Sequence, residues 1–141
     1  MIISPGFVGI DVSKSTLDVF DAAIGRGERI KNTRAPVAGL LKRWKDKGVF
    51  VLFEATGGYD RLLAKALARA GIAFARVNPL RARDFARAAG FLAKTDAVDA
   101  RMLAAMAERL RPKASVPVEA ERERLRLLHR RRAHLGLAQG V

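Results

Sequence analysis

Four carboxylates stand out in the sequence by residue type and spacing: Asp11, Glu54, Asp96 and Asp99. The last two lie three residues apart in KTDAVDA, residues 94–100, which is close to one helical turn. A helix there would place them side by side, and like charges at that spacing are destabilising unless a positive charge lies between them. That charge could come from a helix N-terminus, a neighbouring Lys or Arg, or a metal ion.

The first third of the chain predicts three strands. FVGIDVS (7–13) alternates between two faces, TLDVFDAA (16–23) follows within a few residues, and RIKNTR (29–34) comes after a turn at GRGE (25–28). Short polar or Gly-containing connections of this kind favour successive antiparallel strands.

The remaining pattern alternates helices with buried strands. Helical spacing follows Pro36 and closes at Gly48, and the apolar runs VFVLFE (49–54) and IAFARV (72–77) predict strands buried on both faces. Helices are expected over 57–71, over 78–90 with Pro79 in its first turn, from KTDAVDA through 110, and from residue 119 onward. This order predicts an α/β protein with the ribonuclease H-like fold, a mixed five-stranded sheet flanked by helices, plus a charged C-terminal helix.

In that fold the four carboxylates would converge. Asp11 lies near the end of the first strand and Glu54 ends the strand 49–54, while the helix with Asp96 and Asp99 could close the cluster from above. Converging carboxylates repel one another and need compensating charge. Two Mg²⁺ or Mn²⁺ ions about 4 Å apart would supply it and would activate a nucleophile against a phosphodiester.

Simpler roles remain open for each acid. Asp96 could be a helix N-cap with Asp99 at the third helical position, and Asp11 could be a turn residue. Asp18 and Asp21, in the second strand, are expected to face solvent, although Asp18 could reach the acidic face of the first strand. The loop ATGGYD (55–60) has small residues that let backbone approach a ligand, or that simply make a turn with positive φ at Gly57 or Gly58.

The composition points to a polyanionic partner. The 141 residues include 27 Lys and Arg against 14 Asp and Glu, a net charge of +13, and nucleic acid is the commonest partner of such a protein. With no cysteine, disulfides and thiolate zinc sites are excluded. No signal peptide or membrane-length apolar run is evident, so a soluble intracellular protein is expected.

Four blocks resemble the N-terminal domain of DEDD transposases of the insertion sequence 110 family and their pilin gene-inverting relatives. They are GIDVSKSTLDV (9–19), FEATGGYD (53–60), VNPLRARDFARA (77–88) and KTDAVDA (94–100). The resemblance implies a RuvC-like domain whose catalytic, Mg²⁺-binding acids are Asp11, Glu54, Asp96 and Asp99. It also implies a DNA recombinase guided by a structured RNA encoded in the element.

One departure from the family affects the expected activity. Members continue through a coiled coil into a domain with a serine nucleophile, which this sequence lacks, so recombination by this chain alone is not expected. The expected division is a catalytic domain over 1–111, a linker over 112–118 and the start of a coiled-coil helix over 119–141. That helix is expected to dimerise the protein; a nucleic-acid arm or a frayed end are the alternatives.

Basic residues lie near the acids and within the predicted C-terminal helix. Arg83 and Arg87 are four residues apart, which suits phosphate contacts, although a solvated face is equally open because Asp84 intervenes. Lys94 adjoins the acids. The candidate nucleic-acid contacts are Lys14, Arg76, Arg81, Arg83, Arg87, Lys94, Arg130, Arg131 and Arg132.

Other functions compete with the transposase. The runner-up is a free-standing RuvC-like Holliday-junction endonuclease, which needs no further domain. A phosphotransferase of the actin and sugar-kinase type also opens with a GID-like strand, but it needs a Gly-rich phosphate turn where this chain has SKST (13–16). A non-catalytic nucleic-acid-binding module, in which the acids only cap and balance charge, is the third alternative.

Overall fold

A computed structural model describes residues 6–90 and 98–115 of the chain. The strands are β1 (Gly6–Val12), β2 (Thr16–Asp21), β3 (Arg26–Lys31), β4 (Val49–Glu54) and β5 (Ala73–Val77). The helices are α1 (Arg34–Trp44), α2 (Arg61–Ala70), α3 (Pro79–Ala88) and α4 (Ala100–Leu110).

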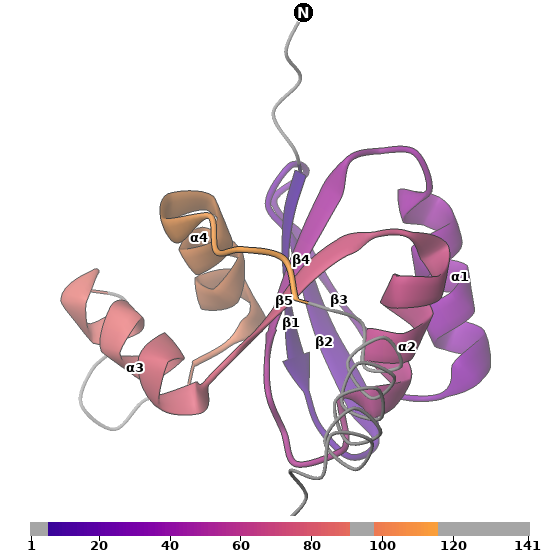
Figure 1. Ribbon diagram of the computed structural model, residues 1–141, viewed down its shortest axis with the longest axis horizontal. Coiled ribbons are helices and arrows are strands. Elements are labelled where there is room, and N and C mark those ends of the chain that lie inside the picture. The colour runs from indigo at the N-terminus through magenta and orange to yellow at the C-terminus, as the bar shows by residue number, and fades with distance from the viewer. Residues whose placement is uncertain (1–5, 91–97, 116–141) are drawn as a thin grey trace, which may run out of the picture.

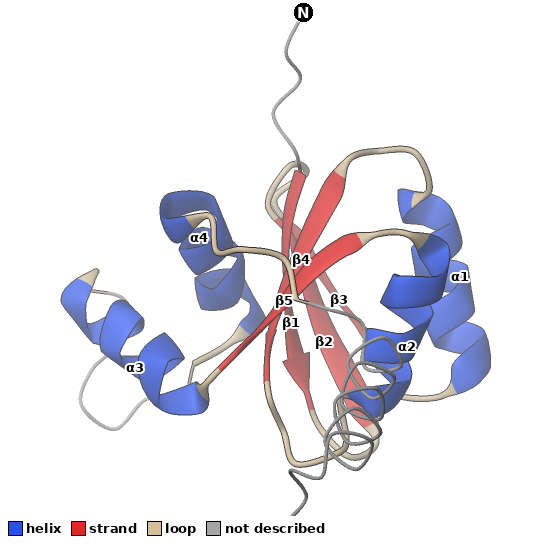
Figure 2. Ribbon diagram, in the orientation of Figure 1, coloured by secondary structure: helices blue, strands red, loops and turns tan. Residues whose placement is uncertain are grey.

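The strands form one mixed sheet in the order β3-β2-β1-β4-β5. β2 is antiparallel to both β1 and β3, whereas β4 is parallel to both β1 and β5. Helices α1 and α2 cover one face of the sheet and α3 and α4 lie on the other (Figures 1 and 2). This three-layer arrangement confirms the predicted ribonuclease H-like fold. None of the helices in the described ranges is long and apolar enough to cross a membrane.

Alternation along β1 builds a core on each side of the sheet. Val8 and Ile10 are fully buried in the core that faces α1 and α2. Phe7 packs into the second core, with Leu103 and Met106 of α4. Because Gly9 and Asp11 have the parity of Phe7, they lie on the α4 face.

Gly9 allows α4 to cross β1 at very short range. A Cβ atom at this position would lie 1.9 Å from the carbonyl oxygen of Ala100 and 2.5 Å from the amide nitrogen of Ala104. No real side chain tolerates such distances, so glycine is required for this packing. The contact fixes the first turn of α4 over the middle of β1, two residues before Asp11.

Several predicted element boundaries were wrong, among them the strand expected at 29–34, which lies at 26–31, and the helix expected from 57, which starts at 61. The turn between β2 and β3 lies at 22–25 and not at 25–28, because the Asp21 Oδ1 accepts a hydrogen bond from the amide of Ala23 and Gly25 takes a positive φ of 63°. The helix predicted from KTDAVDA through 110 begins only at Ala100, the final residue of that stretch, because Asp99 has extended backbone angles and caps it.

The segment after α4 returns to the edge of the sheet. The amide of Ser115 donates to the carbonyl of Phe74 at 2.8 Å, and its Oγ accepts from the amide of Arg76 at 3.0 Å. Ser115, within the predicted linker over 112–118, is therefore hydrogen-bonded to β5. The predicted C-terminal helix, from 119 on, lies outside the described residues.

Candidate functional site

Asp11 and Glu54 lie at the same end of two adjacent parallel strands. The pairing of β1 with β4 ends at Ile10 opposite Phe53, and the two acids are the next residues on each strand. Both have the parity that faces α3 and α4, and both are partly buried. The structure thus brings these two predicted acids to one edge of the sheet.

The electrostatics of both carboxyls show that acids crowd this edge. Burial is the largest cause that raises the pKa of Asp11 above its ordinary 3.8, followed by the negative charges of Asp18 and Asp99, while Arg29 lowers it. Burial also raises the pKa of Glu54 above its ordinary 4.5, with a further contribution from Asp11.

Asp99 has a different role in its helix than predicted. It is the N-cap of α4, with φ −112° and ψ 178°, and its Oδ1 accepts a hydrogen bond of 3.0 Å from the amide of Met102. The expectations that Asp99 stands at the third helical position and shares a helix face with Asp96 are both wrong, because the helix starts one residue after Asp99. Asp96 itself lies outside the described residues.

Asp18 belongs to the acidic edge, although the sequence favoured a solvent-facing position for it. It lies directly opposite Asp11 across β1 and β2. Arg29 of β3, opposite Asp18 in turn, holds it with hydrogen bonds of 2.6 and 3.1 Å. The sequence alone did not determine this pairing: the observed register places Val12 opposite Leu17, whereas a symmetric three-residue turn at 13–15 would have placed Leu17 opposite Asp11.

Gly57 and Gly58 make the loop after Glu54 a sharp turn. Their φ angles are 66° and 120°, as the turn interpretation requires. The loop ends at Asp60, which is only 1% exposed. Its carboxylate accepts hydrogen bonds from the Thr56 hydroxyl at 3.3 Å and from Nε of Arg76 at 2.7 Å.

The predicted basic residues divide into three groups. Arg83 is close enough to the site for its charge to lower the pKa of Glu54, and Arg81, Arg87 and Lys14 are exposed. Arg76 engages Asp60 through its Nε. Lys94 and Arg130, Arg131 and Arg132 lie outside the described residues.

The donor set suits a hard divalent cation. Asp11, Glu54 and Asp99 offer only oxygen, and a bound cation would offset both causes that raise the pKa of Asp11 and Glu54, first burial and then the repulsion between acids. In the parts of the chain that the structure describes, no three acids are already arranged as a metal site. The capping bond to Met102 also occupies one Asp99 oxygen.

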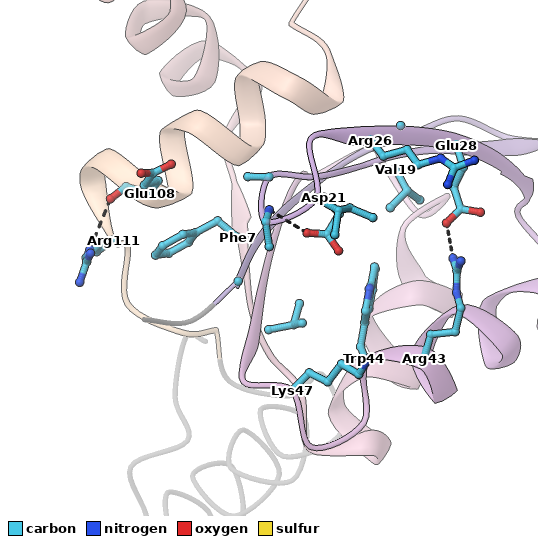
Figure 3. A pocket seen from close by; sticks show the side chains of 16 residues that line it. Phe7, Val19, Asp21, Arg26, Glu28, Arg43, Trp44, Lys47, Glu108 and Arg111 are labelled. Carbon is cyan, nitrogen blue, oxygen red and sulfur yellow. Dashed lines mark hydrogen bonds and ion pairs between the residues drawn. The ribbon is translucent and has the colours of Figure 1, made fainter. Parts of the chain in front are cut away.

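Two clefts differ in how near they lie to these acids. The larger, of about 860 Å³, lies at the opposite end of β1, where Phe7, Trp44 and Arg111 line it and Arg43 pairs with Glu28 (Figure 3). The smaller, of about 490 Å³, lies between β2 and α4 and includes Asp99 and Arg101 in its lining. The smaller cleft is therefore the one that adjoins the acidic edge.

Comparisons with known proteins give a family match and similar solved structures. The sequence pattern of the DEDD transposase family of the insertion sequence 110 type, described as a transposase, matches residues 8–136. No curated protein matches the chain by sequence.

Two of the similar solved structures are of RuvC from Thermus thermophilus, each 16% identical with a TM-score of 0.46. The structure in complex with a Holliday junction substrate aligns over 79% of this chain and 99% of its own. The other RuvC structure aligns over 77% of this chain and 97% of its own.

Proposed function

Because the chain belongs to the DEDD transposase family of the insertion sequence 110 type, we propose that it is the metal-dependent catalytic domain of a DNA transposase. The observation that carries the proposal is the crowding of carboxylates at one edge of the sheet. Asp11, Asp18 and Asp99 come from β1, β2 and the start of α4, yet the charges of the last two reach Asp11. Glu54 of β4 feels the charge of Asp11 in turn.

Asp11, Glu54 and Asp99, with Asp96 from outside the described residues, would hold Mg²⁺ or Mn²⁺. When bound, the metal would activate the attacking oxygen and stabilise the leaving oxygen at a phosphodiester. The protein's own contribution is to hold the acids close despite their repulsion: strand pairing fixes Asp11 beside Glu54, and Gly9 brings the first turn of α4 onto β1.

DNA is the proposed substrate, and α3 would contact its backbone. Arg83 lies close enough to influence Glu54, so a phosphate held by its guanidinium would approach the acids. Arg81, Arg87 and Lys14 are exposed and can neutralise neighbouring phosphates. Arg76 has one nitrogen committed to Asp60, which leaves the other guanidinium nitrogens for such contacts.

The resemblance extends the proposal beyond the described residues. It suggests a guide RNA, contacts from Lys94 and from Arg130, Arg131 and Arg132, and assembly into a homodimer through 119–141.

Mn²⁺ binding and DNA cleavage test the proposed site. The wild type should bind Mn²⁺ in calorimetry and cleave DNA only with a divalent cation, and an Asp11→Asn, Glu54→Gln variant should lose both. Asp21→Asn is the matched control, because Asp21 holds a turn at the other end of the sheet. Unchanged Mn²⁺ affinity in the double variant would contradict the proposal. Efficient cleavage of a four-way junction by this chain alone would favour a free-standing junction endonuclease.

A further inference from the structure

The two loops that follow the strands of Asp11 and Glu54 are joined by a single side chain. Asn32 lies between β3 and α1, and its Nδ2 donates to the carbonyl of Ser13 at 2.9 Å and to the carbonyl of Tyr59 at 2.8 Å. Its backbone amide donates to the carbonyl of Ser15 at 2.9 Å. One residue therefore makes hydrogen bonds to loop 13–15 and to loop 55–60.

The hydrogen bonds fix the orientation of the Asn32 amide group. Both partners of Nδ2 are carbonyl oxygens, which only accept, so the reversed amide would place an oxygen against two oxygens. The consequence is that Oδ1 is buried without a hydrogen-bond partner among the described residues. A buried acceptor in that state lowers stability, and such costs concentrate where function constrains the residue.

The loop after Glu54 is also held from its other side. The buried carboxylate of Asp60 accepts from Arg76 on β5 and from Thr56 within the loop. Arg76 lies opposite Phe53, the neighbour of Glu54, in the pairing of β4 with β5. The loop thus lies between the Asn32 amide and the Arg76 guanidinium.

We infer that Asn32 is a positioning residue for the acidic edge, and that it makes the loops after β1 and β4 open and close as one unit. Asp11 lies two residues before loop 13–15 and Glu54 one residue before loop 55–60, so displacement of one loop alone would distort the strand end that carries one carboxylate and not the other. The inference rests on the proposed function, because the geometry that Asn32 maintains is that of the proposed metal ligands. Residues that orient metal ligands change metal affinity by about 10–100-fold when removed.

Amide hydrogen exchange tests the coupling without any metal. Asn32→Ala should lower the exchange protection of four amides by tenfold or more. They are those of Ser13 and Thr16, at the ends of loop 13–15, and of Ala55 and Arg61, at the ends of loop 55–60. Asp21→Ala, which removes a turn hydrogen bond at the opposite end of the sheet, should leave all four amides unchanged. Loss of protection in one loop alone would overturn the inference. If Asn32→Ala does not fold, the wild type decides: the exchange rates of both loops should respond equally to added urea, and unequal responses would overturn it.

Mn²⁺ affinity tests the positioning role itself. Measured by calorimetry well below the unfolding temperature, it should fall about tenfold in Asn32→Ala and stay unchanged in Asp21→Ala. If the wild type binds Mn²⁺ and Asn32→Ala binds it equally well, the positioning role is wrong while the proposed function stands. A wild type that binds no Mn²⁺ overturns the proposed function and the positioning role together.

Discussion

Asp11 and Asp18 lie directly opposite each other across β1 and β2, and Arg29 binds the second of these carboxylates through two hydrogen bonds. Like charges in directly opposed positions are unfavourable, and here burial raises the pKa of Asp11 and the repulsion from Asp18 raises it further. Arg29 partly offsets it. The three residues form a row across β1, β2 and β3, so the charge state of Asp11 depends on side chains from two other strands.

Asp18 and Arg29 should shift the pKa of Asp11 in opposite directions. Asp18→Asn removes a negative charge that raises this pKa and should lower it, whereas Arg29→Gln removes a positive charge that lowers it and should raise it. NMR titration of the Asp11 carboxyl carbon measures both shifts. Shifts of the same sign in the two variants would contradict this electrostatic account.

The crowded acids should make the metal-free protein less stable at neutral pH. Folding raises the pKa of Asp11 and Glu54 above 3.8 and 4.5, so their contribution to stability is fully present below these values. That contribution is lost as pH rises through the raised folded-state values. Asp11→Asn should therefore raise the melting temperature at pH 7 in EDTA by about 2–4 °C, after allowance for solvent screening of a partly exposed group.

The same comparison at low pH provides the control for Asp11→Asn. At pH 3.5 the wild-type carboxyl is protonated, so the difference between the two proteins should nearly vanish. Adding Mn²⁺ at pH 7 should stabilise the wild type and leave Asp11→Asn almost unchanged. A stabilisation by Asp11→Asn that is independent of pH would point to packing and not to charge.

Two substitutions at Asp99 should separate its capping role from its charge. Asp99→Ala removes the hydrogen bond to the Met102 amide and should cost about 1 kcal/mol of unfolding free energy in urea titrations. Asp99→Asn keeps a capping oxygen and should be near wild type in stability. Both should reduce Mn²⁺ affinity to a similar extent, and a wild-type affinity in Asp99→Asn would show that Asp99 is a cap alone.

Gly9→Ala should be severely destabilising. The added methyl group would lie within 3 Å of Ala100, Leu103 and Ala104, so β1 and α4 must separate. The expected loss is about 3 kcal/mol or more, beyond ordinary overpacking because two of the clashes are with backbone atoms. Urea unfolding measures it. Gly39→Ala on α1 is the control: nothing lies near its added Cβ, and it should stabilise the protein by about 0.5–1 kcal/mol.

Arg83 should affect both the carboxylates and DNA binding. Arg83→Gln removes the charge that lowers the pKa of Glu54 and should raise that pKa. It should also weaken DNA binding for all sequences and reduce the slope of log affinity against log salt by about one. Arg69→Gln, exposed on α2 across the sheet, is the control. Equal effects of the two substitutions would indicate binding to total charge without a defined surface.

Local patterns predicted most of the fold. Helix ends were visible directly, as at Gly71, which takes the left-handed conformation after α2, and at Pro79, which lies in the first turn of α3. The continuous apolar run of β4 identified a central strand and placed Glu54 at its end. The start of α4 was missed because KTDAVDA is compatible with a helix, and the choice of Asp99 as the cap depends on the contact of Ala100 with Gly9.

The side-chain partners at the site depended on long-range geometry. The position of Asp18 opposite Asp11 could be predicted only from the register of the β1–β2 hairpin. The pairing of Arg76 with Asp60 joins β5 to the start of α2, and nothing in the local sequence around either residue distinguishes it from a surface charge. Asn32 was not predicted to have any role, because its partners come from two loops 19 and 27 residues away.

The return of Ser115 to β5 makes the two edges of the sheet unequal. Its two hydrogen bonds occupy outward-facing backbone groups of Phe74 and Arg76, which an incoming strand would otherwise use. Within the described residues, the outer side of β3 has no neighbouring strand, and Arg26, Glu28 and Lys31 are exposed along it. Charged residues on such an edge discourage edge-to-edge aggregation. A partner strand that extends this sheet would therefore have to pair with β3. Its side chains would need charges opposite to those of Arg26, Glu28 and Lys31.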